Sequence, residues 1–118
     1  MSEKNALIFL EHILESIKDI ESFSRGVSKE ELGKNREKLN AIVRSIEIIG
    51  EAGKNIPSSF KKEHPQIAWK EIIGARNVLI HHYFGIDLNI LWAIIKKDIP
   101  ILEKQILDIK EKTDKDKQ

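Results

Sequence analysis

The segment from Arg76 to Tyr83 carries the side chains whose types and spacing are best suited to chemistry. Within eight positions it holds a guanidinium at Arg76, an amide at Asn77, imidazoles at His81 and His82, and a phenol at Tyr83. Arginine presents a planar fork of N–H donors that fits two phosphate oxygens. Histidine can take up or release a proton near neutral pH. These groups are sufficient to cleave a phosphodiester bond in RNA.

Such a cleavage begins when a base removes the proton of the ribose 2′-hydroxyl, which then attacks the adjacent phosphorus. The leaving 5′-oxygen receives a proton, and a cation stabilises the charge of the transition state. No set of metal ligands is apparent: His81 and His82 are adjacent and point to different faces, and His12 and His64 have no partner at ligand spacing. We therefore expect a reaction without a metal ion or a cofactor.

The spacing within this segment sets a geometric problem. On an ideal helix, Arg76 and Tyr83 fall on nearly the same stripe, whereas His81 lies about 140° from Arg76. One straight helix cannot direct Arg76 and His81 at one phosphate. Either the helix relaxes after Ile80, or two copies of the chain meet about a two-fold axis and pool their side chains. We favour the second option, because it supplies two histidines, one as acid and one as base.

A structural interpretation of the same residues stays open. An arginine and a histidine on an amphipathic helix are more often a surface cation and a capping group than a catalytic pair. Likewise, Trp69 and Trp92 are interpreted as anchors of the hydrophobic core rather than as platforms for stacked bases.

The hydrophobic pattern predicts an all-α bundle of four to five helices. A first helix carries apolar residues from Ala6 to Ile20 and ends before Gly26, which suits a left-handed cap. A capping box at Ser28 opens a second segment that reaches Ala52. Whether this segment is one helix or two, with a break near 33–35, is left open.

The second half of the chain continues the helical pattern. A short helix is expected at about 59–63, and a third long helix carries Trp69 to Ile80 and is stopped by Gly85. Asp87 is a suitable N-cap for the last helix. Pro100 lies inside that helix and should kink it or loosen it about one turn earlier.

Length and composition limit the architecture and the partners. A chain of 118 residues forms one domain, which we assign to residues 1–110, followed by a polar tail at 111–118 that should fray. The net charge of +1, from 20 basic and 19 acidic residues, argues against binding of long duplex nucleic acid. The sequence has no cysteine, no long apolar run and no secretory signal, so we expect a cytoplasmic protein that does not enter a membrane.

The chain resembles a known family over most of its length. The Arg-x4-His-x-Tyr pattern at 76–83 matches the signature of HEPN domains and is similar to that of HepT-like ribonuclease toxins. The segments 41–52, 64–76 and 83–88 resemble the motifs that flank this signature in that family. The resemblance extends from the first helix to about Leu102.

The resemblance implies a HEPN-type helical bundle that forms a homodimer and cleaves RNA without a metal ion. The protein would be the toxin of a type VII toxin–antitoxin system, neutralised by a minimal nucleotidyltransferase antitoxin that transfers AMP to the signature tyrosine. By this resemblance Arg76 and His81 are catalytic, and Tyr83 is the site of AMPylation.

Three further residues are supporting candidates. Asn77 follows Arg76 directly and is expected to be a polar helper, while Arg44 and Glu51 are expected to face the same pocket. For Glu51, a structural ion pair is an equal alternative. A runner-up function from another class is a non-catalytic dimeric binding subunit for a nucleotidyltransferase, since a fold does not establish an activity.

Overall fold

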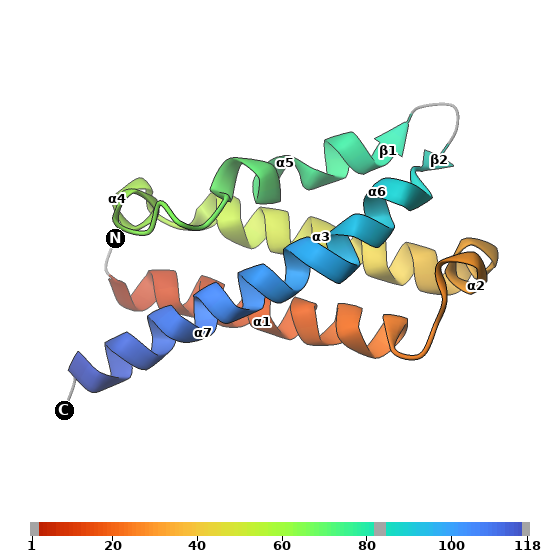
Figure 1. Cartoon of the computed structure of the whole chain (residues 1–118). Helices are drawn as coiled ribbons and strands as arrows, with labels where there is room; N and C mark the ends of the chain where they lie inside the picture. The colour runs from red at the N-terminus through yellow and green to blue at the C-terminus, as the bar shows by residue number, and fades with distance from the viewer. Residues whose placement is uncertain (1–2, 82–84, 117–118) are drawn as a thin grey trace.

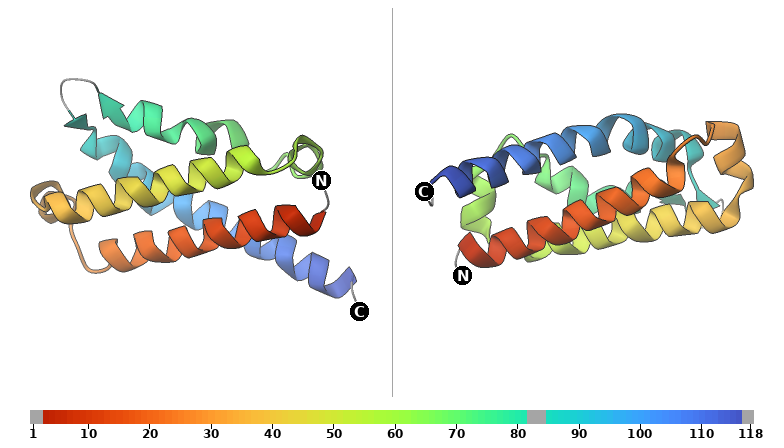
Figure 2. Two further views of the ribbon diagram at one scale, coloured as in Figure 1. Left: turned by 180° about the vertical axis from the view of Figure 1, so that it is seen from behind. Right: turned by 90° about the horizontal axis from the view of Figure 1, so that it is seen from below.

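Two long antiparallel helices form the centre of the molecule. The computed structural model describes residues 3–81 and 85–116, and in it α1 (Glu3–Ser24) lies alongside α3 (Arg36–Asn55) (Figures 1 and 2). Gly26 has φ +70°, so the chain leaves α1 through the left-handed turn that the sequence predicted. The inner stripe of α1 is completely buried and consists of Ala6, Leu10, Ile13, Ile17 and Ile20.

The segment after Gly26 is two helices, which settles the alternative that the sequence left open. Ser28 caps α2 (Lys29–Lys34), because its hydroxyl accepts the backbone N–H of Glu31 at 3.1 Å. Asn35 then leaves the helical conformation, with φ −107° and ψ 90°. Its side chain accepts the backbone N–H of Lys38 at 3.0 Å and thereby starts α3. The capping preference of asparagine thus explains the break.

Two helices of different length follow, α4 (Ser58–Glu63) and α5 (Trp69–Leu79). Trp69 is buried, and its indole N–H donates to the backbone oxygen of His64 at 3.0 Å, which ties the start of α5 to the end of α4. Its interpretation as a core anchor is confirmed. Trp92 is only half-buried, and the ammonium of Lys96 lies 4.7 Å from its ring centroid.

The end of α5 differs from the prediction. The helix stops at Leu79, whereas the sequence predicted that it would include Ile80 and continue towards Gly85. Ile80 is extended, and β1 (Ile80–His81) pairs with β2 (Gly85–Ile86) as a short antiparallel ladder. Two physical features favour this end of the helix. Ile80 and Ile86 pack on the core, and Gly85 has φ +73°, a backbone conformation that glycine adopts readily.

A continuous helical rod completes the fold. It consists of α6 (Leu88–Ala93), the π-helical turn η1 (Ile94–Asp98) and α7 (Ile99–Asp116), and it crosses the α1–α3 pair (Figure 1). The Asp87 carboxylate accepts the backbone N–H of Ile90 at 3.1 Å, so the predicted N-cap is confirmed.

The π-helical turn has an identifiable cause. Pro100 has no backbone N–H, and its ring would clash with the carbonyl one turn earlier in a regular α-helix. The helix does not break at this position. It widens into η1, which ends just before the proline. The loosening that the sequence predicted one turn before Pro100 is therefore confirmed.

The end of the chain also differs from the prediction. The tail that was expected to fray is helical, since α7 extends to Asp116. Ile109 is buried, and Lys110 forms an ion pair with Glu11 of α1. Thr113 donates its hydroxyl to the backbone oxygen of Ile109 at 3.0 Å. The burial of Ile109 and the ion pair of Lys110 hold α7 to the bundle, and the Thr113 bond lies within its last turns.

The predicted all-α bundle is confirmed, and its long elements are α1, α3, α5 and the α6–η1–α7 rod, with α2 and α4 as short additions. The strand pair at the end of α5 was not predicted. In the part of the chain that the structure describes, no helix combines the length and the apolar character needed to cross a membrane.

Two carboxyl groups meet between α1 and the rod. The pKa of Glu103 is raised above its ordinary value, first by a hydrogen bond with Glu21, then by burial and by the negative charge of Glu21. Lys18 opposes the shift in part. A carboxyl whose folded pKa exceeds its unfolded pKa stabilises the fold below the unfolded pKa, and this contribution is lost as the pH rises through the folded pKa.

The substitution Glu103→Gln should therefore stabilise the protein at neutral pH. Glutamine mimics the protonated carboxyl, so Tm at pH 7 should rise by about 2–4 °C, the scale of a favourable surface change. The gain should shrink as the pH falls to about 4, where wild-type Glu103 is itself protonated. Thermal unfolding followed by circular dichroism between pH 3.5 and 7.5 measures this, with the exposed Glu15→Gln of α1 as control. A pH-independent difference would contradict the assignment.

Candidate active site

Two glycines of α3 set the distance to α5. A Cβ added to Gly50 would lie 3.3 Å from the backbone oxygen of Ile73 and 3.4 Å from that of Ile72. A Cβ on Gly53 would lie 3.4 Å from Cγ1 of Ile73. Because neither glycine has a side chain, the two helices can approach closely here. The neighbouring turns of α3 and α5 are therefore also brought face to face.

Arg76 meets an acidic residue next to this close approach. Its Nε donates to Oε2 of Glu47 at 2.8 Å, although the two residues are 29 positions apart in the sequence. The side chains remain 53% and 30% exposed respectively. An exposed ion pair of this kind contributes only about 0–1 kcal/mol to stability. Its contribution to the stability of the fold is therefore small.

The outer part of the Arg76 guanidinium is available. Within residues 3–81 and 85–116, neither terminal nitrogen of Arg76 donates a hydrogen bond. Four N–H groups of the fork can therefore bind an anion that approaches from solvent. Asn77, the next residue of α5, is also exposed.

The supporting candidates of α3 lie on the face that carries Glu47. Arg44 precedes Glu47 by three positions and Glu51 follows it by four, so the three side chains share one side of the helix. Arg44 and Glu51 are both exposed. Among the described residues, neither side chain forms an ion pair, and the contact with Arg76 is made by Glu47.

Sequence reasoning missed Glu47. The available signal was its position between Arg44 and Glu51 on one helical face, in a segment that already contained two candidates. The sequence does not give its partner, because the pairing depends on how α3 crosses α5.

The chain leaves the helical conformation before it reaches the signature histidine. The backbone of His81 lies in β1 opposite Gly85. The angle of about 140° between Arg76 and His81 assumed an unbroken helix, and it does not apply because α5 ends at Leu79. The side chain of His81, and Tyr83 with its neighbour His82, lie outside the described residues.

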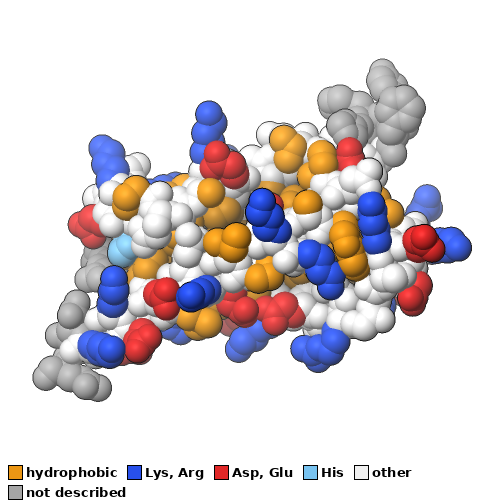
Figure 3. Space-filling model, viewed as in Figure 1, with side chains coloured by type: hydrophobic (Ala, Val, Ile, Leu, Met, Phe, Trp, Pro, Cys, Tyr) orange, Lys and Arg blue, Asp and Glu red, His pale blue; other side chains and the backbone are white. Residues whose placement is uncertain are grey.

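A hollow of about 310 Å³ opens in the surface of the bundle. It lies between α3, α5 and the rod, and its lining includes Ile46 and Ala75, the sequence neighbours of Glu47 and Arg76. The amide of Gln105 donates to the backbone oxygen of Gln66 at 2.8 Å at its edge. On this side of the molecule, hydrophobic side chains reach the surface among lysines and acidic residues (Figure 3).

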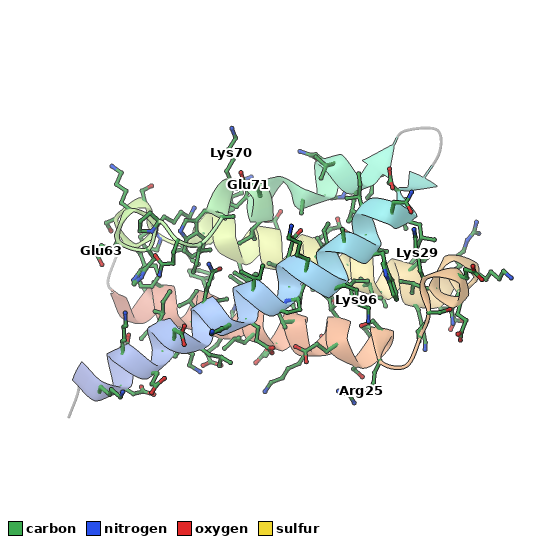
Figure 4. The ribbon with its side chains drawn as sticks, viewed as in Figure 1. Arg25, Lys29, Glu63, Lys70, Glu71 and Lys96 are labelled. Atoms are coloured by element: carbon green, nitrogen blue, oxygen red, sulfur yellow. The ribbon has the colours of Figure 1, made fainter. Side chains whose placement is uncertain are left out.

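The charged side chains that line the hollow are acidic. Glu71 of α5 and Asp98 of η1 belong to its lining. Figure 4 shows Lys70 and Glu71 together on α5, with Lys70 pointing away from the bundle. Among the described residues, no three histidine, aspartate or glutamate side chains are grouped to hold a metal ion. The charged groups of the hollow are therefore carboxylates, and the cation of the candidate site is Arg76, which follows the lining residue Ala75 in α5.

Comparisons with known proteins identify the family to which the chain is similar. A family model described as Ribonuclease HepT-like matches residues 13–109. The chain is 46% identical to a probable ribonuclease HepT of Thermococcus cleftensis, covering 80% of this chain and 86% of that protein. It is 42% identical to a putative RNase of Methanocaldococcus jannaschii, covering 90% and 97% respectively. No solved structure matches the chain.

A further relative is longer. The chain is 44% identical to a Methanocaldococcus jannaschii protein named gamma-glutamylcyclotransferase and putative RNase, over 97% of this chain and 51% of that protein. The chain thus spans about half the length of this relative.

The close approach of α3 and α5 can be tested by filling it. Gly50→Val adds a branched side chain against the backbone of Ile73, so the free energy of unfolding should fall by about 1–3 kcal/mol. The Glu47–Arg76 contact should be lost as α5 moves outward. Urea unfolding measures the first effect.

Gly74→Ala is the matched control, because a Cβ on Gly74 of α5 meets nothing within 4 Å. Replacing a helical glycine in open space should raise stability by about 0.5–1 kcal/mol. Equal effects of Gly50→Val and Gly74→Ala would show that the two helices are not in close contact.

Proposed function

This chain belongs to the HepT-like ribonuclease family, and from that premise we propose that it is a metal-independent endoribonuclease. The observation that carries the proposal is the exposed guanidinium of Arg76, which is held by Glu47 at 2.8 Å and keeps its terminal nitrogens accessible. An arginine fork in this state suits a phosphodiester. We further propose that the protein acts in the cytoplasm as the toxin of a type VII toxin–antitoxin system.

The proposed chemistry divides the work between two residues. Arg76 binds the scissile phosphate and stabilises the charge that develops on it in the transition state. His81 removes the proton of the 2′-hydroxyl or delivers a proton to the leaving 5′-oxygen. The products are a 2′,3′-cyclic phosphate and a free 5′-hydroxyl. DNA is not a substrate, because it lacks the attacking hydroxyl.

A homodimer would supply two copies of His81, one for each proton transfer. Support for a second copy comes from exposed apolar side chains. Val78 is 56% exposed and Ile101, in the lining of the hollow, is 50% exposed. A large exposed aliphatic side chain in the lining of an apolar hollow, such as Ile101, is typical of a protein–protein interface.

RNA cleavage should continue in excess EDTA and should leave 2′,3′-cyclic phosphate ends, as product analysis by mass spectrometry can show. His81→Ala should lower the rate by about 10²–10⁴-fold, because it removes a proton-transfer group. Arg76→Lys should lower it at least about 10-fold, since lysine retains the charge and loses the planar fork. Arg25→Lys is the matched control, because Arg25 is an exposed arginine just beyond α1 (Figure 4).

Cleavage that depends on added magnesium, or cleavage of an oligonucleotide with a single 2′-deoxy substitution at the scissile position, would contradict this mechanism. Wild-type protein that binds a nucleotidyltransferase yet leaves RNA intact would favour the runner-up, a non-catalytic dimeric binding subunit.

We also propose that a cognate minimal nucleotidyltransferase neutralises the protein by AMP transfer to Tyr83. The support is the position of Tyr83 in the Arg-x4-His-x-Tyr signature of a chain matched by the HepT-like family model. The transferred AMP brings a negative phosphodiester and a purine next to the catalytic segment. Its phosphate can pair with Arg76, so it competes with RNA for the same guanidinium.

Incubation with the nucleotidyltransferase, ATP and magnesium should add the mass of AMP to the peptide that contains Tyr83. RNA cleavage should decrease in proportion, while the circular dichroism spectrum stays unchanged, because blockade does not require unfolding. The same addition at an undiminished level in Tyr83→Phe protein would show that another residue is modified.

A further inference from the structure

We propose that Glu47 is a positioning residue that sets the orientation in which Arg76 binds the phosphate of RNA. The inference rests on the proposed ribonuclease function of Arg76. It concerns a residue that the signature segment does not contain, since Glu47 lies on α3 and Arg76 on α5.

The atoms in contact define this orientation. Glu47 accepts from Nε of Arg76, the nitrogen at the inner side of the guanidinium, at 2.8 Å. With Nε engaged, a phosphate can form two parallel hydrogen bonds only with the terminal nitrogens, at the outer end of the fork. Glu47 thus selects an end-on approach of the phosphate over a side-on approach through Nε.

The exposed fractions of the two side chains also favour an approach of the phosphate from the solvent side of Arg76. The Glu47 side chain is 30% exposed and that of Arg76 is 53% exposed, so Glu47 is the more buried of the pair and Arg76 the more open to solvent. An inhibitory contact would instead occupy the terminal nitrogens, where the phosphate binds. The observed hydrogen bond leaves that end of the fork accessible.

The turn of α3 that carries Glu47 is packed against the rest of the fold. Its neighbour Ile46 is 3% exposed in the core, and Gly50, one turn later, packs against the backbone of α5. A long, flexible arginine side chain therefore acquires a fixed partner before RNA arrives. Less rotamer freedom is lost when the phosphate binds, which favours the reactive geometry.

The negative charge of Glu47 has an opposite effect on affinity. A carboxylate beside the guanidinium weakens the attraction of a phosphate in the ground state. Removing it should leave KM unchanged or lower it, because the site becomes more positive. The same change should lower kcat, because Arg76 is no longer oriented. If Glu47 had only a structural role, its removal would not lower kcat while leaving KM unchanged or lower.

Three substitutions separate position from charge. Glu47→Ala removes the acceptor, and kcat should fall about 10–100-fold, the scale expected for a misplaced catalytic group. Glu47→Gln keeps an oxygen at nearly the same place without the charge, whereas Glu47→Asp keeps the charge and withdraws the oxygen by one methylene. Positioning predicts that Glu47→Gln retains more kcat than Glu47→Asp. Glu37→Ala is the matched control, since Glu37 is an exposed glutamate in the first turn of the same helix.

A measurement without RNA tests the contact directly. The Nε–H proton of Arg76 should give a distinct, slowly exchanging NMR signal in wild-type protein. It should persist in the Glu37→Ala variant and disappear in the Glu47→Ala variant. Thermal unfolding of each variant shows whether the fold is intact; if Glu47→Ala does not fold, the order of Glu47→Gln and Glu47→Asp decides.

The outcomes separate the two proposals. If wild-type protein cleaves RNA and Glu47→Ala has the kcat of the Glu37→Ala control, positioning by Glu47 is wrong and the ribonuclease function stands. An increased kcat would identify Glu47 as an inhibitory contact and also overturn the proposal. If wild-type protein cleaves no RNA, the proposed function is wrong, and the role of Glu47 is rejected with it.

Discussion

The backbone of α3 lies against α5 at two glycines, and the site depends on this contact. A Cβ on Gly50 would meet the backbone oxygen of Ile73 at 3.3 Å, so a larger residue would separate the helices. Because the helices touch there, the adjoining turns also meet, and Arg76 reaches Glu47 with a hydrogen bond of 2.8 Å. The small residues of α3 are thus part of the site, although they carry no functional group.

The rod that ends the chain depends on a different constraint. Pro100 cannot donate a backbone hydrogen bond, and the preceding turn widens into the π-helical segment Ile94–Asp98. The hollow of about 310 Å³ is lined by residues of this turn together with residues of α3 and α5. A proline and a pair of glycines therefore shape the elements that line this hollow.

The sequence was most informative where a local rule applies. Ser28 and Asp87 were predicted as helix caps and are caps, because a short oxygen-bearing side chain satisfies free N–H groups at a helix start. It was less informative where the outcome depends on contacts with distant segments. The chain leaves α5 at Ile80 because that residue and Ile86 pack on the core. The polar end of α7 stays helical as it contacts α1 through Lys110.

The same division holds for the candidate site. The sequence alone determined the all-α class, most helix starts and the segment in which four residues separate Arg76 from His81. These features depend on periodicity, capping and residue type. Only the tertiary structure decided that Arg76 is paired with Glu47 and not with Glu51, one turn further along α3. Both carboxylates lie on the same helical face. The crossing of α3 and α5 at Gly50 determines which of them reaches the guanidinium, and no local pattern encodes that crossing.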